Sequence, residues 1–169
     1  MVLLALLLMA LQSPGGATIP PGSAGAQTTD TQAADHDPFA ALRVQWAKDL
    51  HDKHVEDSLA QYADDANFIS DTGRTHGMAS LRQLFSTITQ TFDSDLTFTS
   101  QRVEVSGQLA YDSGTYTETL LNRATGNTQK MAGDYVTVYR REKAANGNEL
   151  WLIVEQVWTG GEISVRAAR

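Results

Sequence analysis

The spacing of apolar side chains predicts helices in the first half of the chain. Apolar residues recur at intervals of three and four in one segment, as on one helix face: Phe39, Leu42, Trp46 and Leu50. Asp37 and Pro38 precede this stripe, and this pair is typical of a helix start because Asp accepts from free backbone amides while Pro loses no needed donor. We therefore expect the first helix to begin at Pro38.

Two further helical stripes follow. Val55, Leu59 and Tyr62 repeat the pattern over two turns and predict a short second helix. Beyond Gly77, the third stripe is the most regular in the chain and consists of Met78, Leu81, Phe85, Ile88 and Phe92. Between them, Phe68 is expected to start an edge strand that turns back at residues 71–73.

The remainder of the chain has the pattern of a sheet. Its segments are rich in Thr, Val and Tyr, and the expected strands are 98–105, 110–121, 128–142 and 150–158. Turns that contain glycine separate these strands, so consecutive strands are expected to pair antiparallel. Three helices followed by a long curved sheet predict an α+β fold, with the helices covering one sheet face.

The beginning of the chain differs from the rest. Residues 2–11 form an uncharged apolar run, too short to span a bilayer as a helix but suited to a secretory signal. The alternative, a buried helix of the domain, is disfavoured by the Pro-, Gly- and Ala-rich tract that follows. We expect cleavage after Ala17 or Ala26 and a secreted or periplasmic protein. The expected organisation is a signal peptide and small-residue tract (1–26), a disordered linker (27–37), one domain (38–161) and a C-terminal tail (162–169).

The amino-acid composition disfavours or excludes several classes of binding partner and of site chemistry. The 13 Lys and Arg residues stand against 20 Asp and Glu residues, and a net charge of −7 disfavours nucleic acids and anionic membrane surfaces. The absence of cysteine excludes a thiol nucleophile, a zinc–thiolate site, disulfides and a lipid-anchored cysteine. No phosphate-binding loop, nucleophile elbow or His-Glu-x-x-His motif is present. We therefore expect no cofactor and no stable membrane anchor.

Three segments carry a family resemblance. Residues 46–66, 133–141 and 151–158 together resemble the SnoaL-like branch of the nuclear transport factor two-like superfamily, over roughly residues 38 to 161. The resemblance implies a cone-shaped, curved antiparallel sheet wrapped around three N-terminal helices, the cystatin-like α+β barrel, with a pocket inside. It also implies a homodimer. Members of the superfamily include isomerases, dehydratases, epoxide hydrolases, cyclases and proteins without known activity, so membership alone names no reaction.

Strand alternation sorts side chains by face. Asp134 shares parity with Val136 and Val138, and we expect this face to meet the helices. The same argument, from Leu152 and Val154, directs Gln156 and Trp158 toward the pocket. The opposite face is then expected to form the homodimer interface, through Tyr135, Thr137, Tyr139, Trp151 and Ile153.

The resemblance to ketosteroid isomerases suggests a catalytic arrangement. Those enzymes use a tyrosine on the first helix, an aspartate base on the first strand and a protonated aspartate on a later strand. Matching the segments puts Trp46 at the tyrosine, Ser70 with Asp71 beside it at the base, and Asp134 at the later acid. Only Asp134 matches in residue type, and Trp46 can donate a hydrogen bond but cannot act as a general acid.

The candidate site residues follow from these arguments. The catalytic candidates are Asp134, Asp71 and His76, which precedes the third helix at the expected mouth of the cone. The ligand-binding candidates are Trp46, Tyr62, Tyr116, Gln156 and Trp158. Structural roles compete with these: packing for the tryptophans, a turn for Asp71, and a hydrogen-bonded structural acid for Asp134.

Metal binding is not expected. His51 and His54 stand three residues apart, but they lie in a polar helix junction that is typical of a solvated linker.

Two hypotheses for function remain. In the first, the domain binds a small, largely apolar molecule without catalysis. In the second, it is a cofactor-free acid–base enzyme, a lyase, isomerase or hydrolase, that uses Asp134 with Asp71 or His76. The deciding feature is whether two titratable groups converge in the pocket, because acid–base catalysis needs them within hydrogen-bond reach of the substrate.

Overall fold

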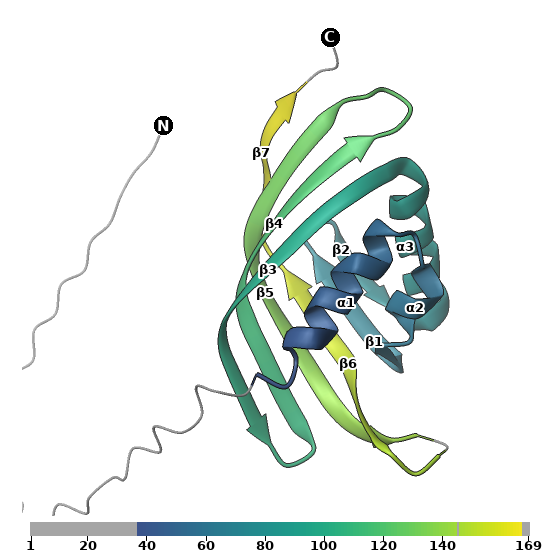
Figure 1. Cartoon of the computed structure of the whole chain (residues 1–169), viewed down its shortest axis with the longest axis vertical. Coiled ribbons are helices and arrows are strands. Elements are labelled where there is room, and N and C mark those ends of the chain that lie inside the picture. The colour runs from purple at the N-terminus through teal and green to yellow at the C-terminus, as the bar shows by residue number, and fades with distance from the viewer. Residues whose placement is uncertain (1–36, 145, 167–169) are drawn as a thin grey trace, which may run out of the picture. The chain divides into compact units, whose positions relative to one another are not determined.

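The structure, a computed structural model, describes residues 37–144 and 146–166. The expected signal peptide and most of the linker lie outside these residues. The helices are α1 (Ala40–His51), α2 (Val55–Leu59) and α3 (Met78–Thr91). The strands are β1 (Tyr62–Ser70), β2 (Gly73–His76), β3 (Phe92–Ser106), β4 (Leu109–Asn122), β5 (Thr128–Lys143), β6 (Glu149–Trp158) and β7 (Gly161–Arg166). The helices lie within the curve of the sheet (Figure 1), which confirms the α+β cone.

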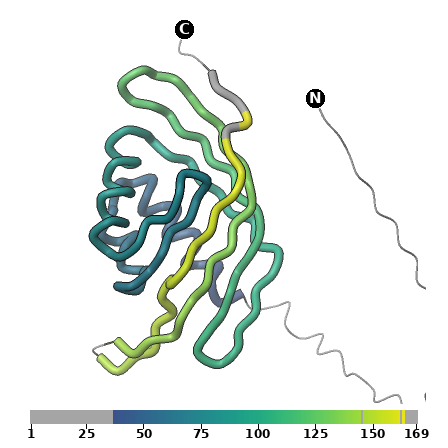
Figure 2. The backbone as a smooth tube through the Cα atoms, turned by 180° about the vertical axis from the view of Figure 1, so that it is seen from behind, coloured from purple at the N-terminus to yellow at the C-terminus, as the bar shows by residue number. Residues whose placement is uncertain are grey.

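The sheet has the strand order β2-β1-β6-β5-β4-β3, and β7 pairs with β5. The antiparallel meander of β3 to β6 is confirmed, and these long strands run side by side in Figure 2. β1 pairs parallel with β6, so the first strand of the chain lies inside the sheet and the short β2 is the edge. The prediction of an edge strand at Phe68 was therefore wrong.

Three boundaries differ from those expected. Tyr62 begins β1 instead of ending the second helix, because the Ile153 amide of β6 donates to the Gln61 carbonyl and draws this segment into the sheet. β3 starts at Phe92, directly after α3, and is longer than expected. β7 lies almost entirely within the segment expected to be a tail. No helix in the described part of the chain is long and apolar enough to cross a membrane.

Two glycines allow the chain to approach itself closely where the sheet curves. A Cβ at Gly114 would lie 2.1 Å from the Thr99 carbonyl oxygen, beside the irregularity between Ser100 and Arg102 in β3. A Cβ at Gly133 would lie 1.7 Å from the Thr159 carbonyl oxygen. Any side chain at these positions would push the neighbouring backbone away, so the curvature depends on both glycines.

Aromatic rings fill the space between helices and sheet. Trp46 of α1 contacts Trp158 and Phe85 edge to face, at ring-centre distances of 5.8 and 5.7 Å. Phe39 stacks on Tyr139 at 4.0 Å. These contacts form one continuous core, which also contains Tyr62, Phe68, Phe98, Tyr116, Tyr135 and Trp151.

The face prediction for β5 was wrong. Tyr135 and Tyr139 are 2 % exposed and face the helices, whereas Val136 is 39 % exposed on the outer face. Large rings are needed to fill the wide space under a curved sheet, while valine suits an exposed strand surface, so side-chain volume outweighed apolarity. The homodimer face expected from Tyr135, Thr137 and Tyr139 is consequently part of the interior.

A register shift explains why the prediction of which β6 side chains face the core is only partly right. Tyr139 pairs with Ile153 but Val138 pairs with Glu155, so Val154 is an extra residue in the strand. Ile153 and Gln156 are both 3 % exposed as a result. The inward orientation predicted for Gln156 is confirmed, and Trp158 packs into the core as expected.

Candidate functional site

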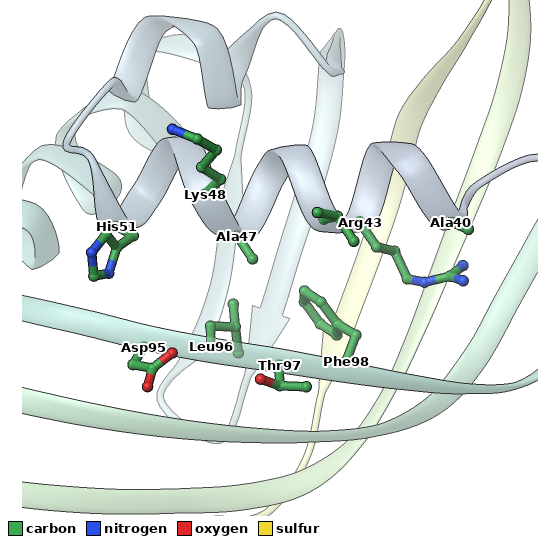
Figure 3. A pocket seen from close by; sticks show the side chains of 10 residues that line it. Ala40, Arg43, Ala47, Lys48, His51, Asp95, Leu96, Thr97 and Phe98 are labelled. Atoms are coloured by element: carbon green, nitrogen blue, oxygen red, sulfur yellow. The ribbon is translucent and has the colours of Figure 1, made fainter.

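An open groove of about 540 Å³ lies between α1 and the edge strand β3 (Figure 3). We call it the α1–β3 groove. Its lining residues are Ala40, Arg43, Val44, Ala47, Lys48 and His51 from α1, and Asp95, Leu96, Thr97 and Phe98 from β3. Sites for small molecules usually measure about 300–1,000 Å³, so the groove has the size of such a site.

The sequence of α1 explains why the groove exists. Trp46 and Leu50 anchor one face of the helix in the core, where both are buried. The neighbouring face presents the small side chains Ala40 and Ala47 to β3 and leaves space above Leu96. β3 ends the strand order of the sheet, so no further strand covers this side.

One end of the groove is formed by a buried charge network. Arg43 Nη1 donates to Asp112 Oδ2 at 2.6 Å, and the guanidinium also pairs with Asp37. Asp112 is fully buried and accepts in addition from Ser100 Oγ at 2.5 Å and from the Tyr135 hydroxyl at 2.9 Å. Because these donors occupy both of its oxygens, Asp112 serves the structure.

The network also affects the pKa values of its members. Burial would lower the pKa of Arg43, but the hydrogen bond to Asp37 and the charge of Asp112 outweigh burial and raise it. Burial raises the pKa of Tyr135 far above its ordinary value, and the charge of Asp112 adds to this effect. Arg43 therefore stays charged and Tyr135 stays protonated as a hydrogen-bond donor.

The other end of the groove contains His51 and Asp95 (Figure 3). His51 Nδ1 lies 2.7 Å from the backbone carbonyl oxygen of Ser94. The Asp95 carboxylate is exposed and makes no hydrogen bond or ion pair with any other described residue. Lys48, which also lines this end, pairs with Asp52 one helical turn on. Its charge is therefore already balanced.

Two of the predicted ligand-binding residues lie in the core. The Tyr62 hydroxyl donates to Gln156 Oε1 at 2.5 Å, and burial raises the pKa of Tyr62 well above its ordinary value. The void beside Gln156 measures only about 10 Å³. A void of this size holds one water at most, so no ligand fits against these two residues in this structure.

The other three predicted ligand contacts, all aromatic, also pack in the core. Tyr116 lies against Trp158 with a ring-centre distance of 4.5 Å, and Trp158 contacts Trp46. The indole N–H groups of Trp46 and Trp158 are buried without a hydrogen-bond partner among the described residues. The Trp46 indole approaches the Tyr62 oxygen closely enough to counteract part of the rise in the pKa of Tyr62, but without the geometry of a hydrogen bond.

The predicted catalytic residues do not converge in the described structure. Asp134 is exposed on the outer face of β5, so its predicted inward orientation was wrong; it shares parity with Val136, which also points outward. His76 is exposed at the end of β2 and lies 3.1 Å from Asn67 Oδ1. Asp71 is exposed in the turn after β1. No hydrogen bond joins any two of these three side chains.

The inner face of β4 carries a half-buried acid that the sequence analysis did not identify. Glu118, on the inner face of β4, accepts from Ser94 Oγ at 2.7 Å, and burial raises its pKa. Burial, then the charges of Glu118 and Asp71, raise the pKa of Tyr116. Alternation from Tyr116 along β4 places Glu118 on the same face, and this signal was available in the sequence.

The histidine pair considered for a metal does not act together. His51 turns to Ser94, whereas His54 lies with Asp49 and Asp57, whose ligand atoms are all within 4.8 Å of one another. Asp49 already accepts from Gln45 Nε2 at 2.6 Å. His54 and Asp57 are exposed, and exposed groups of this kind often lie close together without binding a metal.

Comparison with solved structures confirms the architecture. A conserved protein from Planctomyces limnophilus has a TM-score of 0.65 at 14% identity, over 73% of this chain and 93% of that chain. A ketosteroid isomerase-like protein from Erwinia carotovora atroseptica has a TM-score of 0.61 at 18% identity, over 76% of this chain and 99% of that chain. A hexachlorocyclohexane dehydrochlorinase has a TM-score of 0.60 at 15% identity, over 76% of this chain and 84% of that chain.

Identities this low show a common fold and do not transfer an activity. The comparison with curated proteins gives no match. A family model for the SnoaL-like domain, however, matches residues 44–148, which is more than half of the chain and contains α2, α3 and the strands up to β5 in full. With the cone of helices and sheet described above, this match shows that the chain belongs to the SnoaL-like domain family.

Proposed function

We propose that this domain binds a small, largely apolar molecule in the α1–β3 groove and that its function is binding, not catalysis. The observation that carries the proposal is an open groove of about 540 Å³ with an apolar wall, next to a cone interior that is filled by aromatic rings. Members of this fold bind small molecules or act as cofactor-free enzymes, so the proposal chooses between two known uses of the fold.

The wall of the groove suits an apolar ligand. Val44 is 71 % exposed at its rim, and Ala47 and Phe98 are only partly buried. A ligand that covers these side chains removes apolar surface from water, which contributes about 25 cal/mol for each Å² buried. The dehydrochlorinase of similar fold is named for hexachlorocyclohexane, a small apolar molecule, and this supports the ligand class.

Catalysis has less support than binding. Asp112, behind one end of the groove, is held by Arg43, Ser100 and Tyr135. Asp134 points away from the helices, and Asp71 and His76 lie on the β1–β2 hairpin. Acid–base catalysis needs two such groups around one substrate, and the groove has no such pair among the predicted catalytic residues.

Titration with a neutral apolar dye, N-phenylnaphthylamine, tests the proposal by its gain in fluorescence. The wild-type protein is expected to bind saturably at one site. Val44→Asp should weaken binding at least tenfold, because it places a charge in the apolar wall without touching the core. Val105→Asp is the matched control, since Val105 is also exposed but does not line the groove. Equal binding by both variants would refute the proposed site.

We also propose that the protein acts outside the cytoplasm, in the periplasm or the medium. The support is the apolar run at residues 2–11 followed by small residues. Mass spectrometry of exported protein is expected to find a first residue after Ala17 or Ala26. Exported protein that still begins with Met1 would contradict cleavage.

We further propose a homodimer through the outer sheet face, but with other residues than those first expected. Val136 and its cross-strand neighbour Val157 form an apolar centre there. Light scattering at micromolar concentration should give the mass of a dimer, and Val136→Asp should reduce it to that of a monomer. A wild-type protein that is monomeric at this concentration would rule the dimer out.

A further inference from the structure

We infer that the molecule bound in the α1–β3 groove carries a hydrogen-bond donor, such as an alcohol or phenol hydroxyl, and that it donates one hydrogen bond to the acceptors at the His51 end, which are His51 Nε2 and the Asp95 carboxylate. This inference rests on the proposed function and adds the polar chemistry of the ligand. It starts from the end of the groove where His51 and Asp95 lie (Figure 3).

The contact with Ser94 determines which nitrogen of the neutral His51 ring carries the hydrogen. A carbonyl oxygen can only accept, so the 2.7 Å contact requires the hydrogen on Nδ1. Nε2 of the neutral ring then has a free lone pair. Because His51 is exposed and lines the groove, this lone pair is accessible to a ligand.

Asp95 adds a second hydrogen-bond acceptor at the same end of the groove. Its carboxylate is exposed, lines the groove, and has neither a hydrogen bond nor an ion pair with the described residues around it. The cations nearby are already paired: Lys48 with Asp52, and Lys53 with Asp93. The groups left available at this end are therefore mainly acceptors.

The opposite end does not offer an equivalent contact. Arg43 directs its guanidinium to Asp37 and to the buried Asp112. Between the two ends, Leu96, Phe98 and Ala47 form an apolar wall, to which Thr97 adds one exposed hydroxyl. A matching ligand has an apolar body along the wall and one donor at the His51 end.

Calorimetric titration with a naphthol and with its methyl ether tests this chemistry. The two probes have similar apolar bodies, but only the naphthol donates a hydrogen bond. The wild-type protein is expected to bind the naphthol about tenfold more tightly, the ratio that corresponds to one hydrogen bond of about 1.4 kcal/mol. His51→Asn combined with Asp95→Ala should remove this preference, so that the naphthol and the ether bind with similar affinities.

The variants are chosen to keep the fold. The amide of an asparagine at position 51 can still donate to the Ser94 carbonyl, while the Nε2 acceptor is lost. His54→Asn is the matched control, since His54 is exposed but does not line the groove, and it should retain the tenfold preference.

The outcomes separate this inference from the proposed function. If the wild-type protein binds both probes equally well, the groove is a binding site but the inference is wrong. A preference for the naphthol that persists in the double variant places the acceptor elsewhere and also overturns it. If neither probe binds saturably, the proposed function itself fails, and the inference fails with it.

Discussion

Helix α1 has two faces with opposite properties. On the core side, Trp46 and Leu50 are 3 % and 5 % exposed and pack against the aromatic interior. On the groove side, Val44 is 71 % exposed and His51 keeps one ring nitrogen accessible. One face thus supplies folding energy, while the other leaves apolar and polar groups unsatisfied. Groups that gain nothing from folding are the ones that a ligand can use.

Helix α3 shows what a purely structural helix looks like in the same domain. Its buried residues Leu81, Phe85 and Thr89 share one face, and the α1–β3 groove does not touch it. α1 has apolar residues on both faces, so its pattern is less clearly amphipathic. On α1, an exposed apolar residue outside the core stripe, Val44, lies at the rim of the groove that we propose as the binding site.

The largest effect on stability is expected from the ion pair between Arg43 of α1 and the buried Asp112. Arg43→Leu leaves Asp112 buried without its cation and should cost about 3–5 kcal/mol of unfolding free energy, measured with urea. Arg102→Leu is the control, because its partner Glu104 is exposed, and it should cause no measurable change. Adding Asp112→Asn to Arg43→Leu should recover part of the loss. A cost below about 1 kcal/mol for Arg43→Leu would show that the network is not structural.

A matched pair on α1 measures the difference between its faces directly. Leu50→Ala should lower the unfolding free energy by about 2–5 kcal/mol, because Leu50 is 5 % exposed and its loss leaves a cavity. Val44→Ala should change it by less than about 0.5 kcal/mol, since most of its side chain already meets water. Similar losses for both variants in urea denaturation would mean that the groove is closed in solution.

The stability of the protein should depend on pH through Glu118, on the inner face of β4. Because burial raises the pKa of Glu118 above its ordinary value of 4.5, the folded state holds a proton that the unfolded state has released. Stability therefore falls as the pH rises from that ordinary value through the raised one. Glu118→Gln should remove this fall and be the more stable protein at neutral pH. Parallel stability curves for the two proteins would contradict the burial of a protonated Glu118.

The smallest effect on stability is expected where the groove is filled. Ala47→Phe places a ring in open space between α1 and β3, so the unfolding free energy should stay within about 1 kcal/mol of the wild-type value. Binding of N-phenylnaphthylamine should nevertheless be lost, because the ring occupies the site. Unchanged dye binding in a folded variant would place the ligand elsewhere.

Local pattern was a reliable guide where one face of an element is buried along its whole length. The stripe from Met78 to Phe92 predicted α3 because each turn of the helix packs in the same direction, although Phe92 itself begins β3. Tyr62 shows the limit. Its spacing from Leu59 fits a helix, but the hydrogen bond between Ile153 and Gln61 makes this segment a strand. That partner lies far away in the sequence, and no local pattern contains it.

The candidate site was less predictable than the fold. Alternation correctly grouped Asp134 with Val136, but it could not say which face of β5 meets the helices. That choice depended on the volume under the curved sheet, which rings fill better than valines. The prediction that Gln156 faces the core was right only because the register shift in β6 places one extra residue before it. This residue reverses the alternation of side chains between the two faces.

The sequence by itself determined the α+β class, the order of most elements and the exclusion of cysteine chemistry, because these depend on local periodicity and on composition. Only the tertiary structure decided where the proposed ligand groove lies. The α1–β3 groove requires small side chains on one helix face, an edge strand that nothing covers, and a His51 ring oriented by Ser94. These features come from segments that folding brings together, so their relation cannot be read from either segment alone.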